Sequence, residues 1–347
     1  MSTVTPTPRA SGHAGSLETE KIERRLPLAR FTPQQISGTV PALLFVVLFI
    51  VMVSVQGQVS SSLLQTVLET TVPLMLVGFG QTLVILTGGI DLSVGGIFSL
   101  STALIATKMT GNGDMVLWVP LIILIGLAGG AINGLLIVRT KMQPFIVTLA
   151  SWSVFSGLAL LALPTEGGSV APGLTSALSG SALVPKALII TAALIVAWML
   201  MRRTRFGTAV LSVGSSEQAA KLNDVAVDRT KIIVYALSGL FAALGALYYT
   251  AVLTFSGSPV AGDPFILQSV AAVVIGGTSL AGGRGTLIGT ILGALSLSMI
   301  AQIVFFSGAE SYWSQFVQGA LILAAVLLFA VVELVIRRRT HNATEEV

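Results

Sequence analysis

Between Glu69 and Lys108 the chain carries a single formal charge, Asp91, surrounded by apolar residues. A carboxylate at mid-depth in a bilayer costs at least ~2.5–3.5 kcal/mol, so it must be paired, reach water or accept hydrogen bonds from the backbone. Apolar blocks of similar length recur along the 347 residues, of which 54% are hydrophobic and 10% charged. A soluble domain carries about 25% charged residues. The chain therefore resembles a polytopic membrane protein.

Glycine pairs lie on both sides of Asp91, at Gly88-Gly89 and Gly95-Gly96. Glycine favours the end of a helix, and aspartate favours the start of one, because its carboxylate accepts backbone amides. We therefore predict a helix that breaks here and restarts at Leu92, with Asp91 accepting from the amide of Ser93 or Val94. Broken helices line the substrate path in many transporters. The alternative is that Asp91 only caps a turn and contacts no substrate.

The apolar blocks predict an all-α fold with about ten transmembrane helices and broken helices at membrane depth. A more polar stretch, Val59–Thr70, is interpreted as a short interfacial piece, and Pro164–Pro185 as a loop. Residues 1–38 are expected to be a disordered cytoplasmic tail, 39–336 a single transmembrane domain and 337–347 a second cytoplasmic tail. The predicted spans are Val40–Val55, Thr71–Thr87, Leu92–Thr107, Val116–Val138, Pro144–Leu163, Ala187–Met201, Ile232–Val252, Ile266–Gly277, Thr286–Phe306 and Ser314–Ile336.

The basic residues predict the orientation of these spans. With ten spans both termini lie on one side, and that side holds all of the 19 Lys and Arg residues except Lys108 and Lys186. Positive residues accumulate on the cytoplasmic side of membrane proteins, so both termini are expected to be cytoplasmic in the cell (inner) membrane. The net charge of +4 therefore reflects topology, and no nucleic-acid partner is expected.

Small residues repeat every four positions in several predicted spans, for example at Gly126, Gly130 and Gly134. This spacing lets two helix backbones approach closely in lipid. The segment Val84–Gly96 also resembles Val273–Gly283, which hints at an internal parallel repeat.

The longest internal polar stretch, residues 202–230, falls on the predicted cytoplasmic side. Ser215 or Ser216 is expected to cap a short helix over Glu217–Leu222, which Asn223 or Asp224 would end. A short helix with small central residues suits docking into a groove of another protein. From the residues alone, an amphipathic linker on the membrane surface is equally compatible.

Several chemistries are excluded or disfavoured. The chain has no cysteine, and its two histidines, His13 and His341, lie in opposite tails, so we expect no metal site and no cofactor. It contains no Gly-Lys dipeptide and hence no P-loop of the GxxxxGK[ST] type. It is therefore not expected to be an enzyme, and ATP hydrolysis would fall to a separate subunit.

Five motifs carry a resemblance to a known family. They are GGIDLSVG at Gly88–Gly95, NG at Asn133-Gly134, PFIVTLA at Pro144–Ala150, EQAAKL followed by VDRTKIIVYALSG ending at Gly239, and IGGTSLAGGRGTLIGTILGAL at Ile275–Leu295. In this order they resemble the ribose-type monosaccharide permeases of ABC importers, within the branched-chain amino acid/ribose permease superfamily. The resemblance covers roughly Thr70 to Phe329.

The resemblance implies a permease subunit that works with an ABC ATP-binding subunit, an extracytoplasmic sugar-binding protein and a second permease subunit, as a homodimer or heterodimer in the lipid bilayer. It also implies that the short cytoplasmic helix is the ATPase-coupling segment, formed by Gly214, Glu217, Gln218, Ala219, Ala220, Lys221 and Leu222. The family usually has Ser-Gly-Ile after this helix, where this chain has Asn223-Asp224-Val225. That departure concerns the ATPase contact rather than the substrate.

A neutral sugar is recognised by hydrogen-bonding groups and aromatic faces. The candidate residues of the substrate path are Gln81, Thr82, Asp91, Ser93, Phe98, Asn133, Trp152, Phe155, Gln268 and Gln302. The candidate glycines of the broken helices are Gly88, Gly89, Gly95, Gly96, Gly276, Gly277, Gly282 and Gly283.

Two alternatives compete with a sugar importer. A permease for another small solute, an amino acid or a nucleoside, would have the same architecture. An ion-coupled secondary carrier would use Asp91 as its proton or sodium site. Glu333, another acid inside a predicted span, lies one turn from Arg337 and is expected to pair there, which disfavours an ion relay.

Overall fold

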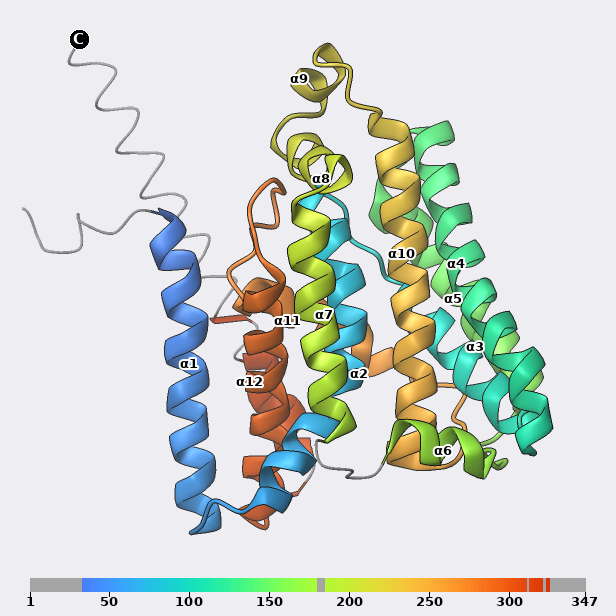
Figure 1. Cartoon of the computed structure of the whole chain (residues 1–347), viewed down its shortest axis with the longest axis vertical. Coiled ribbons are helices and arrows are strands. Elements are labelled where there is room, and N and C mark those ends of the chain that lie inside the picture. The colour runs from blue at the N-terminus through green and yellow to red at the C-terminus, as the bar shows by residue number, and fades with distance from the viewer. Residues whose placement is uncertain (1–32, 180–184, 311, 321–322, 325–347) are drawn as a thin grey trace, which may run out of the picture.

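The structure is a computed structural model that describes residues 33–179, 185–310, 312–320 and 323–324 (Figure 1). The described residues form helices and no strand, apart from isolated bridge pairing such as that between Gly167 and Gly257. The α-helices are α1 (Pro33–Gln56), α2 (Ser61–Leu86), α3 (Ser93–Lys108), α4 (Met115–Thr140), α5 (Pro144–Ala162), α6 (Pro172–Leu178), α7 (Lys186–Arg202), α8 (Arg205–Ser215), α9 (Glu217–Leu222), α10 (Val227–Tyr248), α11 (Asp263–Ile275) and α12 (Leu287–Phe306). A 3₁₀ turn, η2 (Asn112–Asp114), precedes α4, and a π-helix, η3 (Tyr249–Thr254), continues α10.

Within the described residues, five helical stretches are long and apolar enough to cross a membrane, and a sixth if α7 and α8, bent by 78°, form one span. The fold class of an all-α polytopic membrane protein is thereby confirmed. The count of ten stays a prediction, because α3 and α11 are shorter than a full span and most of Ser314–Ile336 lies outside the described residues.

Two expectations about local structure were wrong, and one helix starts earlier than its predicted span. The helix α1 begins at Pro33, ahead of the predicted span Val40–Val55, and the extent of the N-terminal tail stays a prediction. Val59–Thr70 is not a separate interfacial piece, because residues from Ser61 onward form the first turns of α2, capped by Ser60. Its polar side chains bond along the helix, as Gln65 does to Glu69 at 2.8 Å, so polarity does not interrupt it. The loop Pro164–Pro185 contains α6.

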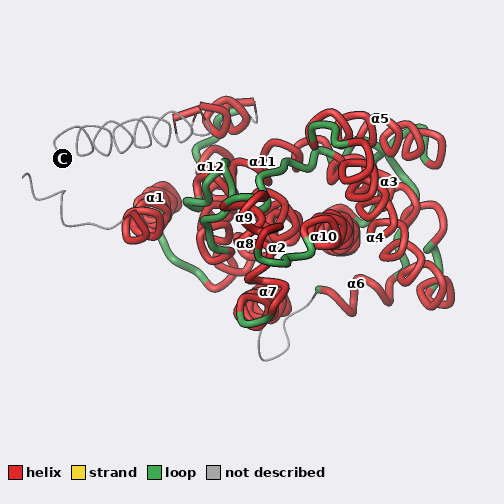
Figure 2. The backbone as a smooth tube through the Cα atoms, turned by 90° about the horizontal axis from the view of Figure 1, so that it is seen from above, coloured by secondary structure: helices red, strands yellow, loops and turns green. Residues whose placement is uncertain are grey.

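Two helices form the centre of the bundle, α2 and α10. Seen from above, α1 lies at one end of the molecule and α3, α4 and α5 at the other (Figure 2). The most extensive packing in the fold joins α10 to α4, and α10 also packs along α2. Most of α2 from Thr71 to Leu86 is buried, which explains why this span is apolar on all sides.

Glycines make the seam between α4 and α10 possible. A Cβ added at Gly130 would lie 2.0 Å from the carbonyl oxygen of Tyr235, and one at Gly126 would lie 2.4 Å from that of Gly239. At Gly134 the nearest atom is the Cα of Ile232, at 2.7 Å. The repeat seen in the sequence therefore serves a contact within the chain, of the kind that small residues permit in lipid.

Lys108 and Lys186 lie at the same end of the bundle, beside α6. Figure 1 shows α8 and α9 at one end and α6 at the other. At the α6 end, Lys186 donates to the carbonyl of Ser176 in α6, and the α3 terminus that carries Lys108 bonds to the segment before α6, through Ala171 N and Met109 O at 2.8 Å. These are the two basic residues that the sequence assigned to the non-cytoplasmic side.

Candidate functional site

The first predicted break follows α2. Gly88 has a φ of +80°, which favours glycine, and its amide donates to the carbonyl of Ile85 at 2.9 Å. The amide of Gly89 donates to the carbonyl of Val84 at 3.1 Å. This pair of bonds is a Schellman cap, which satisfies the last carbonyls of a helix. An extended link then leads to α3.

The second break follows α11 and has the same cap. Gly277 has a φ of +82°, its amide donates to the carbonyl of Val274 at 2.8 Å, and that of Thr278 donates to Val273 at 3.1 Å. The similarity between the two sequence segments thus corresponds to the same backbone geometry. Gly276 is needed for close packing rather than for the cap, since a Cβ there would lie 2.4 Å from the backbone of Gly289 in α12.

Asp91 lies in the link between α2 and α3 and is fully buried. Its Oδ1 accepts from the backbone amide of Ser93 at 3.0 Å and from the Ser93 hydroxyl at 2.6 Å. Its other oxygen, Oδ2, has no hydrogen-bond partner among the described residues, and neither have the buried hydroxyls of Tyr235 and Ser238 on α10. The Tyr235 hydroxyl lies against Gly89, where a Cβ would approach it to 2.4 Å.

A chain of polar side chains continues from Asp91 into the bundle. The Asn133 amide donates to the Ser93 hydroxyl at 2.8 Å, and Ser151 donates to the Asn133 carbonyl oxygen. Three candidate residues from distant parts of the sequence, Asp91, Ser93 and Asn133, are therefore hydrogen-bonded together. Sequence reasoning missed Ser151, because a serine inside a helix more often bonds its own backbone.

Gln81 and Thr82 lie apart from this chain, on α2. The Thr82 hydroxyl is 2.8 Å from that of Thr290 on α12, so it joins two helices. The Gln81 amide is buried, and neither its oxygen nor its nitrogen has a partner in the described part of the chain. The six candidates Gln81, Thr82, Asp91, Ser93, Phe98 and Asn133 are all at most 1% exposed, so none of them is accessible to solvent in this conformation.

Toward the α6 end, the aromatic candidates meet residues that sequence reasoning did not select. The Trp152 indole donates to the Asp263 carboxylate at 3.1 Å. Phe98 stacks on Phe265 with ring centroids 4.5 Å apart, and Tyr249 lies edge-on to Phe98 at 5.5 Å. Tyr249 begins η3, and π-helices are frequent at functional sites. An isolated aspartate beside a proline gives no local signal of such a cluster.

Gly95 and Gly96 do not lie at a break but inside α3. A Cβ at Gly95 would meet Ile266 of α11 at 2.4 Å, and one at Gly96 would meet the carbonyl of Trp152 at 2.7 Å. Phe155 packs on the same side, with its Cβ 2.8 Å from that position. These glycines therefore allow α3 to pack closely against α5 and α11.

The last two candidates lie at the edge of the described structure. The Gln268 amide donates to the side-chain oxygen of Gln318 at 3.0 Å, which ties α11 to the helical residues 312–320. Gln302 is half-buried on α12. Neither residue belongs to the chain of hydrogen bonds that links Asp91, Ser93, Asn133 and Ser151.

The polar segment, residues 202–230, contains two short helices, of which α9 was predicted and α8 was not. The Ser216 hydroxyl accepts from the amide of Ala219 at 3.2 Å, which identifies Ser216 rather than Ser215 as the cap. Asp224, with a φ of +55°, follows the helix, and Val225 donates to the carbonyl of Ala220 at 3.1 Å in a third Schellman cap.

An ion pair anchors α9 to α10. Glu217 is 2.6 Å from the Lys231 ammonium and 3.0 Å from that of Lys221. Hydrogen bonds from Lys231 and then Lys221 lower the pKa of the Glu217 carboxyl. The pair is therefore complete at neutral pH and is lost only as the pH falls through this lowered pKa, below the ordinary value of 4.5. Leu222, by contrast, is 87% exposed.

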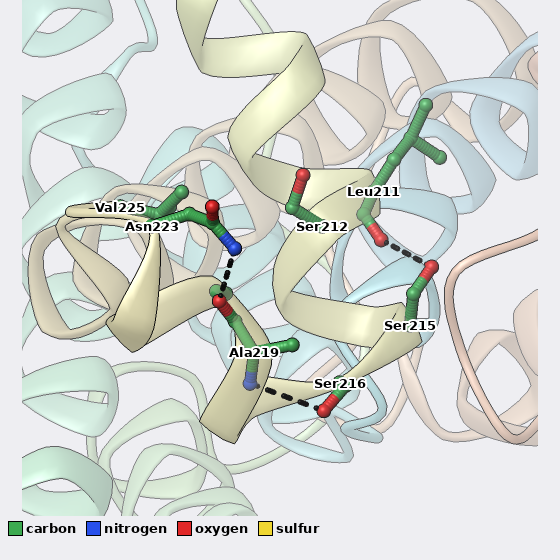
Figure 3. Close-up of a pocket in the computed structure, with 8 residues that line it drawn as sticks. Leu211, Ser212, Ser215, Ser216, Ala219, Asn223 and Val225 are labelled. Carbon is green, nitrogen blue, oxygen red and sulfur yellow. Dashed lines mark hydrogen bonds between the residues drawn. The ribbon is translucent and has the colours of Figure 1, made fainter.

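A groove of ≈ 380 Å³ runs between α8 and α9 (Figure 3). Asn223 lines this groove and donates its side-chain amide to the carbonyl of Ala219 at 2.8 Å. Small side chains and hydroxyls dominate its lining, which consists of Leu211, Ser212, Ser215, Ser216, Ala219, Ala220, Asn223 and Val225. Gln218 is exposed on the same short helix, and Lys221 holds Glu217 beside it.

Replacing Asp224 by glycine is expected to stabilise the end of α9. A side chain at positive φ is disfavoured, so the change should gain up to about 1 kcal/mol. Hydrogen exchange of the amides of 217–222 should slow by up to about fivefold. The control is Asn223→Gly, at a φ of −101° that needs no glycine, where loss of the bond to Ala219 should speed exchange. Faster exchange in Asp224→Gly would contradict the assignment of this cap.

Comparison of the sequence with known proteins identifies permeases over most of the chain. A family model described as the permease component of branched-chain amino acid transport systems matches residues 63–326. The ribose import permease protein RbsC of Bacillus subtilis is 40% identical over 259 residues, 73% of this chain and 80% of that protein. RbsC of Escherichia coli K12 is 35% identical over 76% of this chain and 84% of its own length. The fructose import permease protein FrcC of Rhizobium meliloti is 36% identical over 76% of each chain. No solved structure matches the chain.

Proposed function

Because this chain belongs to the family of permease components of branched-chain amino acid transport systems, and within it to the ribose-type ABC permeases, we propose that it forms the translocation path of an ATP-driven importer for a monosaccharide. The family supplies the membrane component of ABC transporters, and the apolar helices suit a multi-pass protein of the inner membrane. The relatives' names imply an ATP-binding subunit and a substrate-binding protein as partners.

The observation that carries the coupling part of the proposal is the construction of α9. A helix of six residues is capped at both ends, tied by Glu217 to Lys231 at the base of α10, and presents Leu222 almost fully exposed. An exposed leucine beside a groove suits contact with another protein. We therefore assign Glu217–Leu222 to the contact with the ATP-binding subunit and the α9 end of the bundle to the cytoplasm, with Gly214 in the part of the coupling segment that packs against the rest of the chain.

The sugar would pass along the polar chain of Asp91, Ser93 and Asn133 and the aromatic cluster of Phe98, and these four residues are buried in this conformation. Neutral sugars bind to hydrogen-bonding groups and to aromatic faces, and these two sites supply both. The importer would contain a second permease subunit, identical or related. Opening of the path then requires movement of the links at the two helix breaks.

A second candidate substrate is an amino acid, because the matching family model describes branched-chain amino acid transport. The two candidates are separated by competition in cells that express this chain with its ATP-binding subunit and binding protein and that lack other ribose importers. Excess unlabelled ribose or fructose should suppress uptake of labelled ribose, and excess leucine or adenosine should not. Saturable, ATP-dependent uptake of leucine together with no uptake of either sugar would refute the sugar assignment.

A further inference from the structure

Gly214, near the end of α8, packs against the backbone at the end of α2 and against the backbone of the turn that follows α11. A Cβ added at Gly214 would lie 1.8 Å from the carbonyl oxygen of Leu86, the last residue of α2, and 2.5 Å from the amide nitrogen of Gly283. Such distances are far below van der Waals contact, so no side chain fits here without displacing backbone. Gly214 therefore lies between the first break and the turn that follows the second.

The two breaks are also bonded to each other at this point. The amide of Gly283 donates to the carbonyl of Leu86 at 2.9 Å. Gly282 and Gly283 have φ values of +87° and +71°, and a Cβ at Gly282 would lie 3.0 Å from both the Gly214 carbonyl oxygen and the Gly88 amide nitrogen. Three segments far apart in the sequence thus meet in one contact made of backbone atoms.

We propose that this contact, the Gly214 junction (Leu86–Gly88, Gly214 and Gly282–Gly283), transmits movement of the coupling segment to both helix breaks at once. The inference rests on the proposed function, because it takes α8 and α9 as the part that the ATP-binding subunit moves. Gly214 is then a positioning residue inside the permease and not part of the surface that contacts the ATPase.

The junction suits transmission for a mechanical reason. Contacts between backbone atoms cannot be absorbed by a change of rotamer, so a shift of α8 must displace the end of α2 or the 282–283 turn. The end of α2 leads directly into the link that carries Asp91, and the 282–283 turn leads into α12. The hydrogen bond between Gly283 and Leu86 keeps the two displacements in step.

The first test replaces Gly214 by alanine in the transporter assembled with its ATP-binding subunit and binding protein in liposomes. Sugar uptake per ATP hydrolysed should fall by at least about tenfold, because the added methyl forces the breaks apart. Binding of the ATP-binding subunit should stay within about twofold of wild type. Gly157→Ala is the matched control, since a Cβ at Gly157 in α5 meets no atom within 4 Å. An unchanged ratio of uptake to hydrolysis in Gly214→Ala would refute the junction.

The second test does not depend on whether Gly214→Ala folds. The chain has no cysteine, so Ser215→Cys and Arg284→Cys introduce a unique pair on exposed residues beside the junction. A short reducible thiol cross-linker applied after assembly should leave ATP-driven uptake at the level of each single variant treated alike, because α8 and the 282–283 turn already move together in the proposed junction. Loss of uptake in the cross-linked double variant that reductant restores would show that α8 moves relative to this turn and would overturn the inference. Absence of ATP-driven uptake in the wild-type transporter would instead refute the proposed function, and this inference with it.

Discussion

Replacing Asp91 by alanine is expected to abolish sugar uptake and to destabilise the start of α3, whereas replacing it by asparagine is expected to preserve both. Alanine leaves the buried amide and hydroxyl of Ser93 without their acceptor, which costs about 1–3 kcal/mol for each orphaned group. Asparagine keeps an oxygen in the Oδ1 position. Its new NH₂ group takes the place of Oδ2, which has no partner among the described residues.

This pair of variants separates the two roles considered for Asp91. A cap needs an acceptor, and asparagine supplies one; a proton or sodium site needs a charge, which asparagine lacks. Uptake and thermal midpoint should be measured for both variants in the assembled transporter, with Thr107→Val on α3 as a control, since that hydroxyl bonds only the carbonyl of Ala103 in its own helix. If Asp91→Asn lost uptake as completely as Asp91→Ala, the capping role would be wrong.

Replacing Gly130 by leucine is expected to prevent the bundle from assembling. Even a Cβ at this position would lie 2.0 Å from the Tyr235 carbonyl oxygen, so the whole leucine side chain must separate α4 from α10. Overpacking a well-packed contact costs typically ~1–3 kcal/mol, and the clash here is with backbone that cannot change rotamer. The expected result is a loss of folded protein in detergent, measured as monodisperse yield and thermal midpoint.

Gly157→Leu on α5 is the matched control, because the same substitution there meets no neighbouring atom within 4 Å of the Cβ. Its yield should equal that of the wild type within experimental error. A Gly130→Leu protein with wild-type yield and thermal midpoint would show that α4 and α10 do not pack as the structure has them, and would also remove Tyr235 from the vicinity of Asp91.

The sequence predicted best those features that depend on local residues. The bounds of α9, Glu217–Leu222, coincide with the prediction, because a serine cap and a short run of helix-forming residues suffice to determine it. The acceptor role of Asp91 toward Ser93 follows from the same logic. Polar composition was misleading in the first turns of α2. The polar side chains there make hydrogen bonds within the helix, as the Thr70 hydroxyl does to the carbonyl of Thr66, so they do not interrupt it.

Contacts between distant segments could not be predicted. Trp152 and Asp263 are 111 positions apart, and nothing near either residue identifies the other. Gly214 was selected for its place before the coupling helix, yet its contacts with Leu86 and Gly283 are its most specific feature. Gly95 and Gly96 were assigned to a helix break, but they lie inside α3. In the sequence, a glycine pair that ends a helix cannot be distinguished from one that allows a neighbouring helix to pack closely.

The most direct test of the central claim is uptake of labelled ribose or fructose into liposomes that contain this chain, with ATP supplied on the face where α9 lies. The account predicts uptake that requires the ATP-binding subunit, the binding protein and hydrolysable ATP together, and that a proton or sodium gradient does not replace. Gradient-driven uptake by this chain alone, without either partner, would contradict it and would make Asp91 the coupling site for the ion.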